Sequence, residues 1–204
     1  MTPPSLALRG LGAAAGIGLV ALAAAALVRR HQRGARRRAL LERLGRFALE
    51  AVHRVQVPDG MGGFYHVDHL LLTPRGVLVL DTRRVPGLIF GGDQMSEWTV
   101  LARGRRDTFD NPQPALYDRI AAVKALVGDV PVEGLIVFSN VGRFAKGKPK
   151  GVVMLDELDA GLGPIDPEAR ASPADEPDGI ATIRAAWTGL VARLRPSPHE
   201  FTNL

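Results

Sequence analysis

Two aspartates stand in otherwise aliphatic runs of the segment HVDHLLLTPRGVLVLDTRR, which extends from His66 to Arg84. Asp68 and Asp81 lie in the two halves of this segment, on either side of a Thr-Pro-Arg-Gly turn, and the pattern predicts a β-hairpin. A carboxylate among buried Val and Leu side chains is costly unless it is paired, hydrogen-bonded or bound to a metal ion. Each aspartate therefore needs a partner.

The register of the hairpin decides whether the two aspartates meet. If Thr73 pairs with Gly76, Asp68 stands directly opposite Asp81, with Cβ atoms roughly 5 Å apart. A slip of one residue would send the two acids to opposite faces. Facing carboxylates repel each other, and a divalent cation such as Mg²⁺ or Mn²⁺ bound by both is one remedy.

Two interpretations of these residues follow. In the first, Asp68 and Asp81 are metal ligands, the metal activates water against a phosphodiester, and Arg83 on the same strand face stabilises the developing phosphate charge. Arg83 cannot serve as a base, because its pKa is above about 12. In the second, Asp81 and Arg83 form a surface ion pair and Asp68 caps nearby backbone.

The elements around the hairpin predict an α/β fold with a mixed central β-sheet flanked by helices. Hydrophobic periodicity indicates an amphipathic helix at 36–50 and a strand near 52–57 before the hairpin. Further strands are predicted at 87–92, 97–101, 132–140 and 152–155, a basic turn at 103–106, and helices from Asn111 and at 180–194.

Charge is distributed unevenly along the chain. The 204 residues carry a net charge of +5, with a pI near 10.2, and contain no cysteine, which excludes disulfides, thiolate metal sites and a cysteine nucleophile. Residues 1–46 hold nine arginines against one glutamate, a net charge of +8, whereas the remainder holds 17 basic and 20 acidic residues, a net charge of −3. The globular part is not basic, so composition alone does not predict nucleic-acid binding.

An uncharged stretch, GLGAAAGIGLVALAAAALV, covers residues 10–28 and has the length of a single transmembrane helix. The arginine-rich RRHQRGARRR follows directly, so the positive-inside rule predicts a single-pass protein of the inner or cell membrane with its soluble domain in the cytoplasm. A signal peptide cleaved near Ala24–Ala26 is the alternative, and the arginines could also contact DNA or anionic lipid.

The chain thus divides by sequence into six segments. They are a short N-terminal segment (1–9), a transmembrane helix (10–30), a basic juxtamembrane helix (31–50), an α/β domain (51–163), an acidic Pro-rich linker (164–179), and a C-terminal helix and tail (180–204).

The hairpin, followed by GLIFGG, Trp98 and Asn111-Pro112, resembles the nuclease-related domain (NERD) family, which is related to the PD-(D/E)xK nuclease fold. The resemblance extends from about Gly34 to Asn140. It implies a Mg²⁺-dependent DNA nuclease, a hydrolase, in which Asp68 matches the family's first acid and Asp81 the second. Arg83 occupies the place of the family's lysine.

Three departures from the family pattern weaken the catalytic implication. The Gly-Glu pair that opens the family's first helix is replaced by Gly34-Ala35, which leaves Glu42 and Glu50 as displaced substitutes. The Asn-Pro-x-x-Gln motif ends in Ala115, and arginine replaces lysine at position 83. A degenerate membrane-tethered module that binds nucleic acid or a protein partner is therefore the competing hypothesis, and it gains if neither glutamate reaches the aspartate pair.

Two further clusters carry weaker signals. His66, Asp68 and His69 have metal-binding side chains, but His69 should point to the opposite face of its strand, so no zinc site is expected. The basic loop FAKGKPK at 144–150 lacks the Walker spacing. Together with Arg103, Arg105 and Arg106 it could contact a nucleic-acid backbone, although a solvated loop is the simpler interpretation.

Overall fold

The computed structural model describes residues 5–162 and 178–197, with side chains from residue 24 onward except at 33, 161 and 178. The chain forms two compact units, Met1–Glu42 and Arg43–Leu204. Most of helix α1 (Ser5–Gly45) belongs to the first unit. Among the described residues, no helix is both long and apolar enough to cross a membrane. The predicted transmembrane segment, 10–30, lies largely outside the described side chains.

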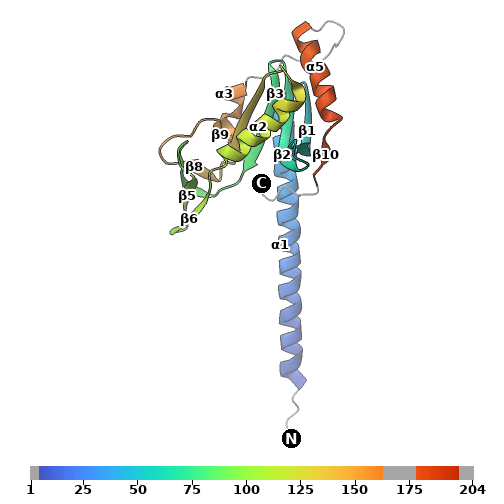
Figure 1. Cartoon of the computed structure of the whole chain (residues 1–204). Helices are drawn as coiled ribbons and strands as arrows, with labels where there is room; N and C mark the ends of the chain where they lie inside the picture. The colour runs from blue at the N-terminus through green and yellow to red at the C-terminus, as the bar shows by residue number, and fades with distance from the viewer. Residues whose placement is uncertain (1–4, 163–177, 198–204) are drawn as a thin grey trace. The chain divides into compact units, whose positions relative to one another are not determined.

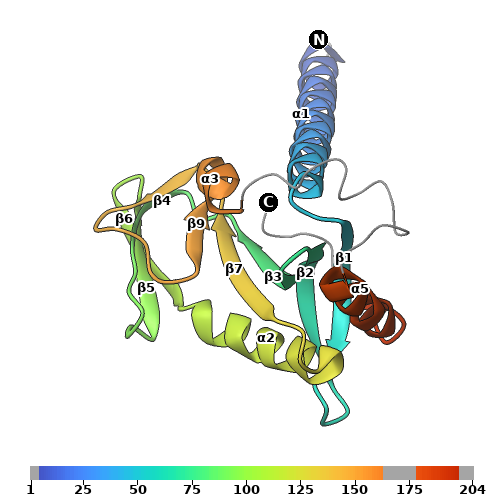
Figure 2. The same ribbon diagram turned by 90° about the horizontal axis from the view of Figure 1, so that it is seen from above.

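A six-stranded mixed sheet forms the centre of the second unit, in the order β10-β1-β2-β3-β7-β9 (Figures 1 and 2). The first four strands in this order pair antiparallel, whereas β3, β7 and β9 pair parallel. The strands are β1 (Glu50–Pro58), β2 (Phe64–Thr73), β3 (Gly76–Arg83), β7 (Val132–Phe138), β9 (Val152–Met154) and β10 (Arg195–Pro196). The predicted mixed sheet flanked by helices is therefore confirmed.

A second, four-stranded sheet has the order β6-β5-β4-β8. Its strands are β4 (Gly87–Phe90), β5 (Glu97–Ala102), β6 (Arg105–Asp110) and β8 (Gly142–Phe144). The predicted basic turn at 103–106 was too long, because only Arg103 and Gly104 form the turn, with φ angles of 51° and 74°. Positive φ at both positions matches the twist of a two-residue hairpin, so the chain re-enters a strand at Arg105.

Helix α2 (Gln113–Val127) lies along one face of the six-stranded sheet, and α5 (Asp178–Val191) lies beside α2 and β1 (Figure 2). Gly134 of β7 permits this close approach, because a Cβ there would lie 2.5 Å from Ile120 Cδ1. The interface buries Leu70, Val79 and Ile136 completely. The described part of the fold also contains a short 3-10 turn, η1 (Leu155–Glu157), and α3 (Leu158–Leu162).

The bounds of the predicted 36–50 helix were wrong at both ends. The helix is the last part of the continuous α1, which begins at Ser5 and ends at Gly45, and Glu50 is already the first residue of β1. Backbone hydrogen bonds from Arg46 N to Arg43 O and from Phe47 N to Leu44 O tighten the last turn. The predicted acidic linker, 164–179, lies almost wholly outside the described residues.

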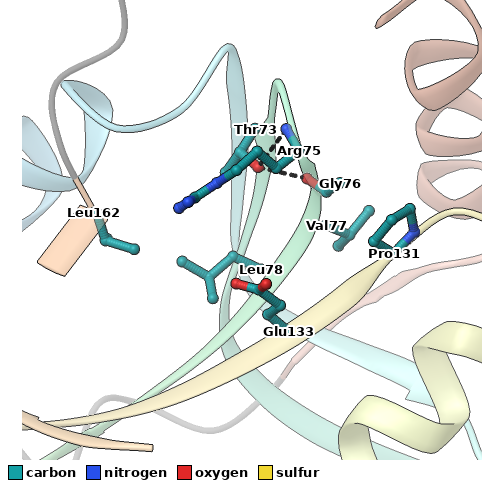
Figure 3. Close-up of a pocket in the computed structure, with 8 residues that line it drawn as sticks. All are labelled: Thr73, Arg75, Gly76, Val77, Leu78, Pro131, Glu133 and Leu162. Atoms are coloured by element: carbon teal, nitrogen blue, oxygen red, sulfur yellow. Dashed lines mark hydrogen bonds between the residues drawn. The ribbon is translucent and has the colours of Figure 1, made fainter. Parts of the chain in front are cut away.

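The turn of the β2–β3 hairpin is held by hydrogen bonds of Thr73 and packs against Pro131 in the loop before β7 (Figure 3). Thr73 Oγ1 donates to Gly76 O at 2.9 Å and accepts from Arg75 N at 3.3 Å. Gly76 has a φ of 138°, and a Cβ there would lie 2.2 Å from Pro131 O. The small pocket drawn in Figure 3 is at this end of β3, whereas the aspartates are at the other end.

Candidate functional site

The register of the hairpin places the two aspartates opposite each other. The pairing runs from Thr73 with Gly76 to His69 with Leu80, as expected, and one further step brings Asp68 opposite Asp81. The ladder ends at that step. Asp68 Oδ2 instead accepts the backbone N–H of Thr82 at 2.8 Å. A side-chain carboxylate therefore replaces the main-chain acceptor where the strands separate.

Asp68 is fully engaged in hydrogen bonds. Its Oδ2 also accepts the hydroxyl of Thr82 at 2.8 Å, and its Oδ1 lies 3.1 Å from His66 Nε2. The other ring nitrogen of His66, Nδ1, lies 2.7 Å from Ser197 Oγ. Because both oxygens have protein partners and the residue is only 8% exposed, Asp68 is held in one orientation. The position of Ser197 in this chain of contacts was not predicted from the sequence.

Asp81 is the most buried charge of the site, with 2% of the residue exposed. Burial raises the pKa of its carboxyl above the ordinary value of 3.8, and the neighbouring Asp68 raises it further, while Arg119 and Arg83 oppose the shift. Oδ2 lies 3.0 Å from Arg119 Nη1 and 3.8 Å from Arg83 Nη2. The ion pair of Asp81 with Arg83 that was expected from their shared strand face is thus present, although Asp81 is buried rather than on the surface. Arg119 is nearer to Asp81 than Arg83 is.

Arg119, on α2, was not identified from the sequence. Its Nε donates to His66 O at 2.5 Å and its Nη1 donates to Ala115 O at 2.8 Å, so the guanidinium contacts Asp81 by charge rather than by a well-aligned hydrogen bond. Asp81 Oδ2 indeed has no hydrogen-bond partner among the described residues. A signal did exist: Arg119 lies four residues after Ala115 and four before Val123, on the apolar stripe of the predicted helix.

Glu50, one of the two displaced glutamates, does not lie at the aspartate pair. Glu50 lies opposite Leu72 on β2, four residues from Asp68 and therefore about 13 Å away along the strand. It forms an ion pair with Arg184 and accepts the Trp187 indole N–H at 2.9 Å, so it fastens α5 to β1. Glu42 belongs to the first unit and is exposed on α1. Glu50 therefore does not replace the missing helix acid.

The residues present do not fit a resident divalent metal ion. Among the described side chains, no group of three or more His, Cys, Asp or Glu residues is arranged to hold one. Both oxygens of Asp68 already accept hydrogen bonds, and the charge of Asp81 is offset by Arg119 and Arg83, which lie 3.0 Å and 3.8 Å from its Oδ2. The repulsion between the two carboxylates is thus relieved by guanidinium groups.

The other singled-out residues have structural partners. His69 points away from Asp68, as expected, and its Nδ1 lies 2.8 Å from Nδ1 of His53. Gln113 of the altered motif donates to Asp93 Oδ1 at 2.7 Å and to Lys150 O at 3.0 Å. These bonds tie the loop before β9 to the start of α2.

Comparison with known proteins relates the chain to one family. The family model described as nuclease-related domain (NERD) matches residues 33–139. An uncharacterized protein of Bacillus anthracis is 27% identical over 88 residues, which cover 43% of this chain and 42% of that protein. The chain thus aligns with less than half of this relative's length. No solved structure matches significantly. The matched segment contains Asp68, Asp81, Arg83 and Arg119, whereas Ser197 lies beyond it.

Proposed function

Because the chain belongs to the nuclease-related domain (NERD) family, we propose that its domain is a nuclease-related module that binds nucleic acid without metal-dependent hydrolysis. One observation carries the proposal. The buried carboxylate of Asp81 lies 3.0 Å from one guanidinium and 3.8 Å from another, so its charge is offset by arginine side chains. Loss of the family's lysine at position 83 removes a group that can position and deprotonate water.

Neutralisation of the aspartates supports the nucleic-acid part of the proposal. Two unpaired carboxylates would repel a phosphodiester, whereas Arg119 and Arg83 offset the charge of Asp81. Arg83 retains 25% of its side chain exposed, and the neighbouring Arg84 is exposed as well. Guanidinium groups bind phosphate in a bidentate manner, so this end of β3 suits a nucleic-acid backbone better than a protein partner.

The proposal is tested by metal binding and by cleavage. Calorimetric titration of the full chain with Mg²⁺ or Mn²⁺, with and without duplex DNA, is expected to show no saturable metal binding. Linear, circular and single-stranded DNA should remain intact under conditions in which the duplex is bound. Asp81→Asn is the informative variant, and Asp129→Asn, an exposed aspartate elsewhere in the domain, is the matched control. Mg²⁺-dependent cleavage that only the Asp81 variant loses would refute the proposal.

A metal-dependent DNA nuclease is the second candidate. In it Asp68 and Asp81 hold Mg²⁺ or Mn²⁺, and Arg83 stabilises the phosphate. The observation in its favour is that Asp81 Oδ2 is buried, faces Asp68 and lacks a hydrogen-bond partner among the described residues. The same titration and cleavage assay decides between the two candidates.

Membrane attachment is a separate part of the proposal. The uncharged sequence at 10–28 and the arginines that follow it support a single-pass helix with the domain on the cytoplasmic side. Carbonate extraction of membranes tests the attachment: a retained chain supports it, and full release contradicts it. Protease protection of the domain in inverted and right-side-out vesicles tests the orientation.

A further inference from the structure

The outer face of the four-stranded sheet carries an arginine at each end of one row of side chains. Backbone pairing aligns Arg106 with Leu101, Leu101 with Leu88, and Leu88 with Arg143, which gives one row across β6, β5, β4 and β8. Directly paired residues in a sheet project to the same side. Trp98, an odd number of residues from Leu101 on β5, is fully buried on the other face, so the row faces outward.

This face is exposed and its cations have no partners in the described part of the chain. Arg103, Arg106 and Arg143 are all exposed, and none of the ion pairs or side-chain hydrogen bonds there involves them. Leu101 and Val141, which lie on the same face, are 41% and 42% exposed. We call Arg103, Arg106, Arg143, Leu101 and Val141 the arginine face.

The arginine face and the aspartate site lie on opposite sides of the strands that join them. Arg83 pairs with Phe138 and shares its side of the sheet, and Phe138 stacks on Trp98 of the inner face with ring centroids 6.1 Å apart. β3 ends at Arg83 and the chain enters β4 at Gly87, while the neighbouring β7 leads into β8 in the same way. Ser139 N donates to Arg83 O at 2.9 Å, so the two connections remain side by side. Leu88 follows Arg83 by five residues, a span of at most about 18 Å. The intervening Arg84 is exposed.

We propose that the arginine face binds the phosphodiester backbone of nucleic acid as a surface separate from Arg83. Four neighbouring strands place Arg106 and Arg143 about 14 Å apart, which spans about four phosphates of one DNA strand. The inference rests on the proposed function, since it assumes that the domain binds nucleic acid.

Acidic residues on the same outer face bound the arginine face on one side. Their position favours nucleic acid over a lipid surface as the ligand. Glu97 pairs with Asp110 on the same two strands, at the far end of the outer face from Arg103. A flat membrane would bring these acids as close to its lipid phosphates as the arginines. A nucleic-acid strand that follows the row from Arg106 to Arg143 avoids them, so charge complementarity favours the strand.

The test compares two double variants of the full chain with the same change of charge. Arg106→Gln/Arg143→Gln removes the row's cations, and Arg75→Gln/Arg193→Gln removes two exposed arginines from other parts of the domain. Arg106→Lys/Arg143→Lys keeps the charge. Anisotropy of a labelled duplex of about 20 base pairs gives Kd between about 50 and 200 mM salt, and circular dichroism confirms the fold. The arginines of residues 1–46 are unchanged in every chain.

We expect Arg106→Gln/Arg143→Gln to raise Kd by about tenfold and to lower the slope of log K against log salt by about 2. The control should change Kd by less than about twofold, and the lysine variant should retain most of the affinity. Equal binding by the glutamine variant and its control would overturn the inference alone. No duplex binding by the unaltered chain would overturn the proposed function with it. Loss of binding to phosphatidylserine vesicles with unchanged DNA binding would assign the face to lipid and overturn the inference.

Discussion

Replacement of Arg119 by methionine tests whether Asp81 is held by an ion pair across the β3–α2 interface. Methionine keeps much of the aliphatic volume and removes the charge. The variant leaves Asp81 buried beside Asp68 with Arg83 as its remaining cation, 3.8 Å away. It also removes the donor to His66 O.

The expected loss of unfolding free energy is about 3 kcal/mol near neutral pH. Removal of one partner from a fully buried ion pair costs about 3 to 5 kcal/mol, and the lower end applies because 16% of the Arg119 side chain is exposed. The lost hydrogen bond to His66 O contributes about 1 kcal/mol of this. Loss of the second hydrogen bond, to Ala115 O, costs less free energy, since this carbonyl can still accept a hydrogen bond within α2.

The cost should depend on pH in a defined direction. Burial raises the pKa of Asp81 above 3.8, so the folded state binds this proton more tightly than the unfolded chain does. The contribution of this group to stability is therefore present at low pH and is lost as pH rises through the raised pKa. Arg119 opposes that rise in pKa, so its removal should raise the pKa of Asp81 further. The free energy of unfolding of the variant should then fall more steeply as pH rises. The variant is expected to lose less stability at about pH 5 than at about pH 8.

Urea denaturation followed by fluorescence of the buried Trp98 and Trp187 measures these effects. In a double-mutant cycle with Asp81→Asn, we expect a coupling energy of about 2 kcal/mol between Arg119 and Asp81. Arg83→Met is the control and should cost less than about 1 kcal/mol, since Arg83 is more distant and more exposed. A coupling below about 0.5 kcal/mol, or an equal cost for the two arginine variants, would refute the ion pair as the support of Asp81.

Three further predictions concern stability and are measured by the same denaturation. Gly76→Ala should cost about 3 kcal/mol, because its φ of 138° and a carbonyl oxygen 2.2 Å from the added Cβ both oppose it; a cost below 1 kcal/mol would contradict the close approach. Glu50→Gln should lower the free energy of unfolding by under about 1 kcal/mol, since it loses the exposed ion pair with Arg184 but keeps an oxygen that accepts the Trp187 indole N–H. Glu50→Ala removes that acceptor and should cost more. Equal costs for the two variants would show that the hydrogen bond from Trp187 does not contribute. Thr82→Val should cost about 1 kcal/mol by removing the hydroxyl donor to Asp68, and no measurable change would show that the backbone bond suffices.

Much of the hairpin and of the aspartate pair was predictable from the sequence. Alternation of side chains and a Gly-containing turn fix a hairpin locally, and the pairing of Thr73 with Gly76 was enough to bring Asp68 opposite Asp81. The mixed sheet and α2 followed from hydrophobic periodicity over short stretches. The second sheet was less accessible, because its pairing of β4 with β8 joins segments about fifty residues apart.

Which groups surround the aspartates was decided by the tertiary structure. Arg119 reaches Asp81 because α2 crosses β2 and β3 at that level, and Ser197 reaches His66 because β10 adds to the edge of β1. Strand periodicity cannot supply such contacts, since they depend on how separate elements pack. The sequence by itself therefore determined that two carboxylates face each other. Only the packed fold decided that Asp81 is buried and that a second guanidinium, that of Arg119, lies nearer to it than Arg83 does.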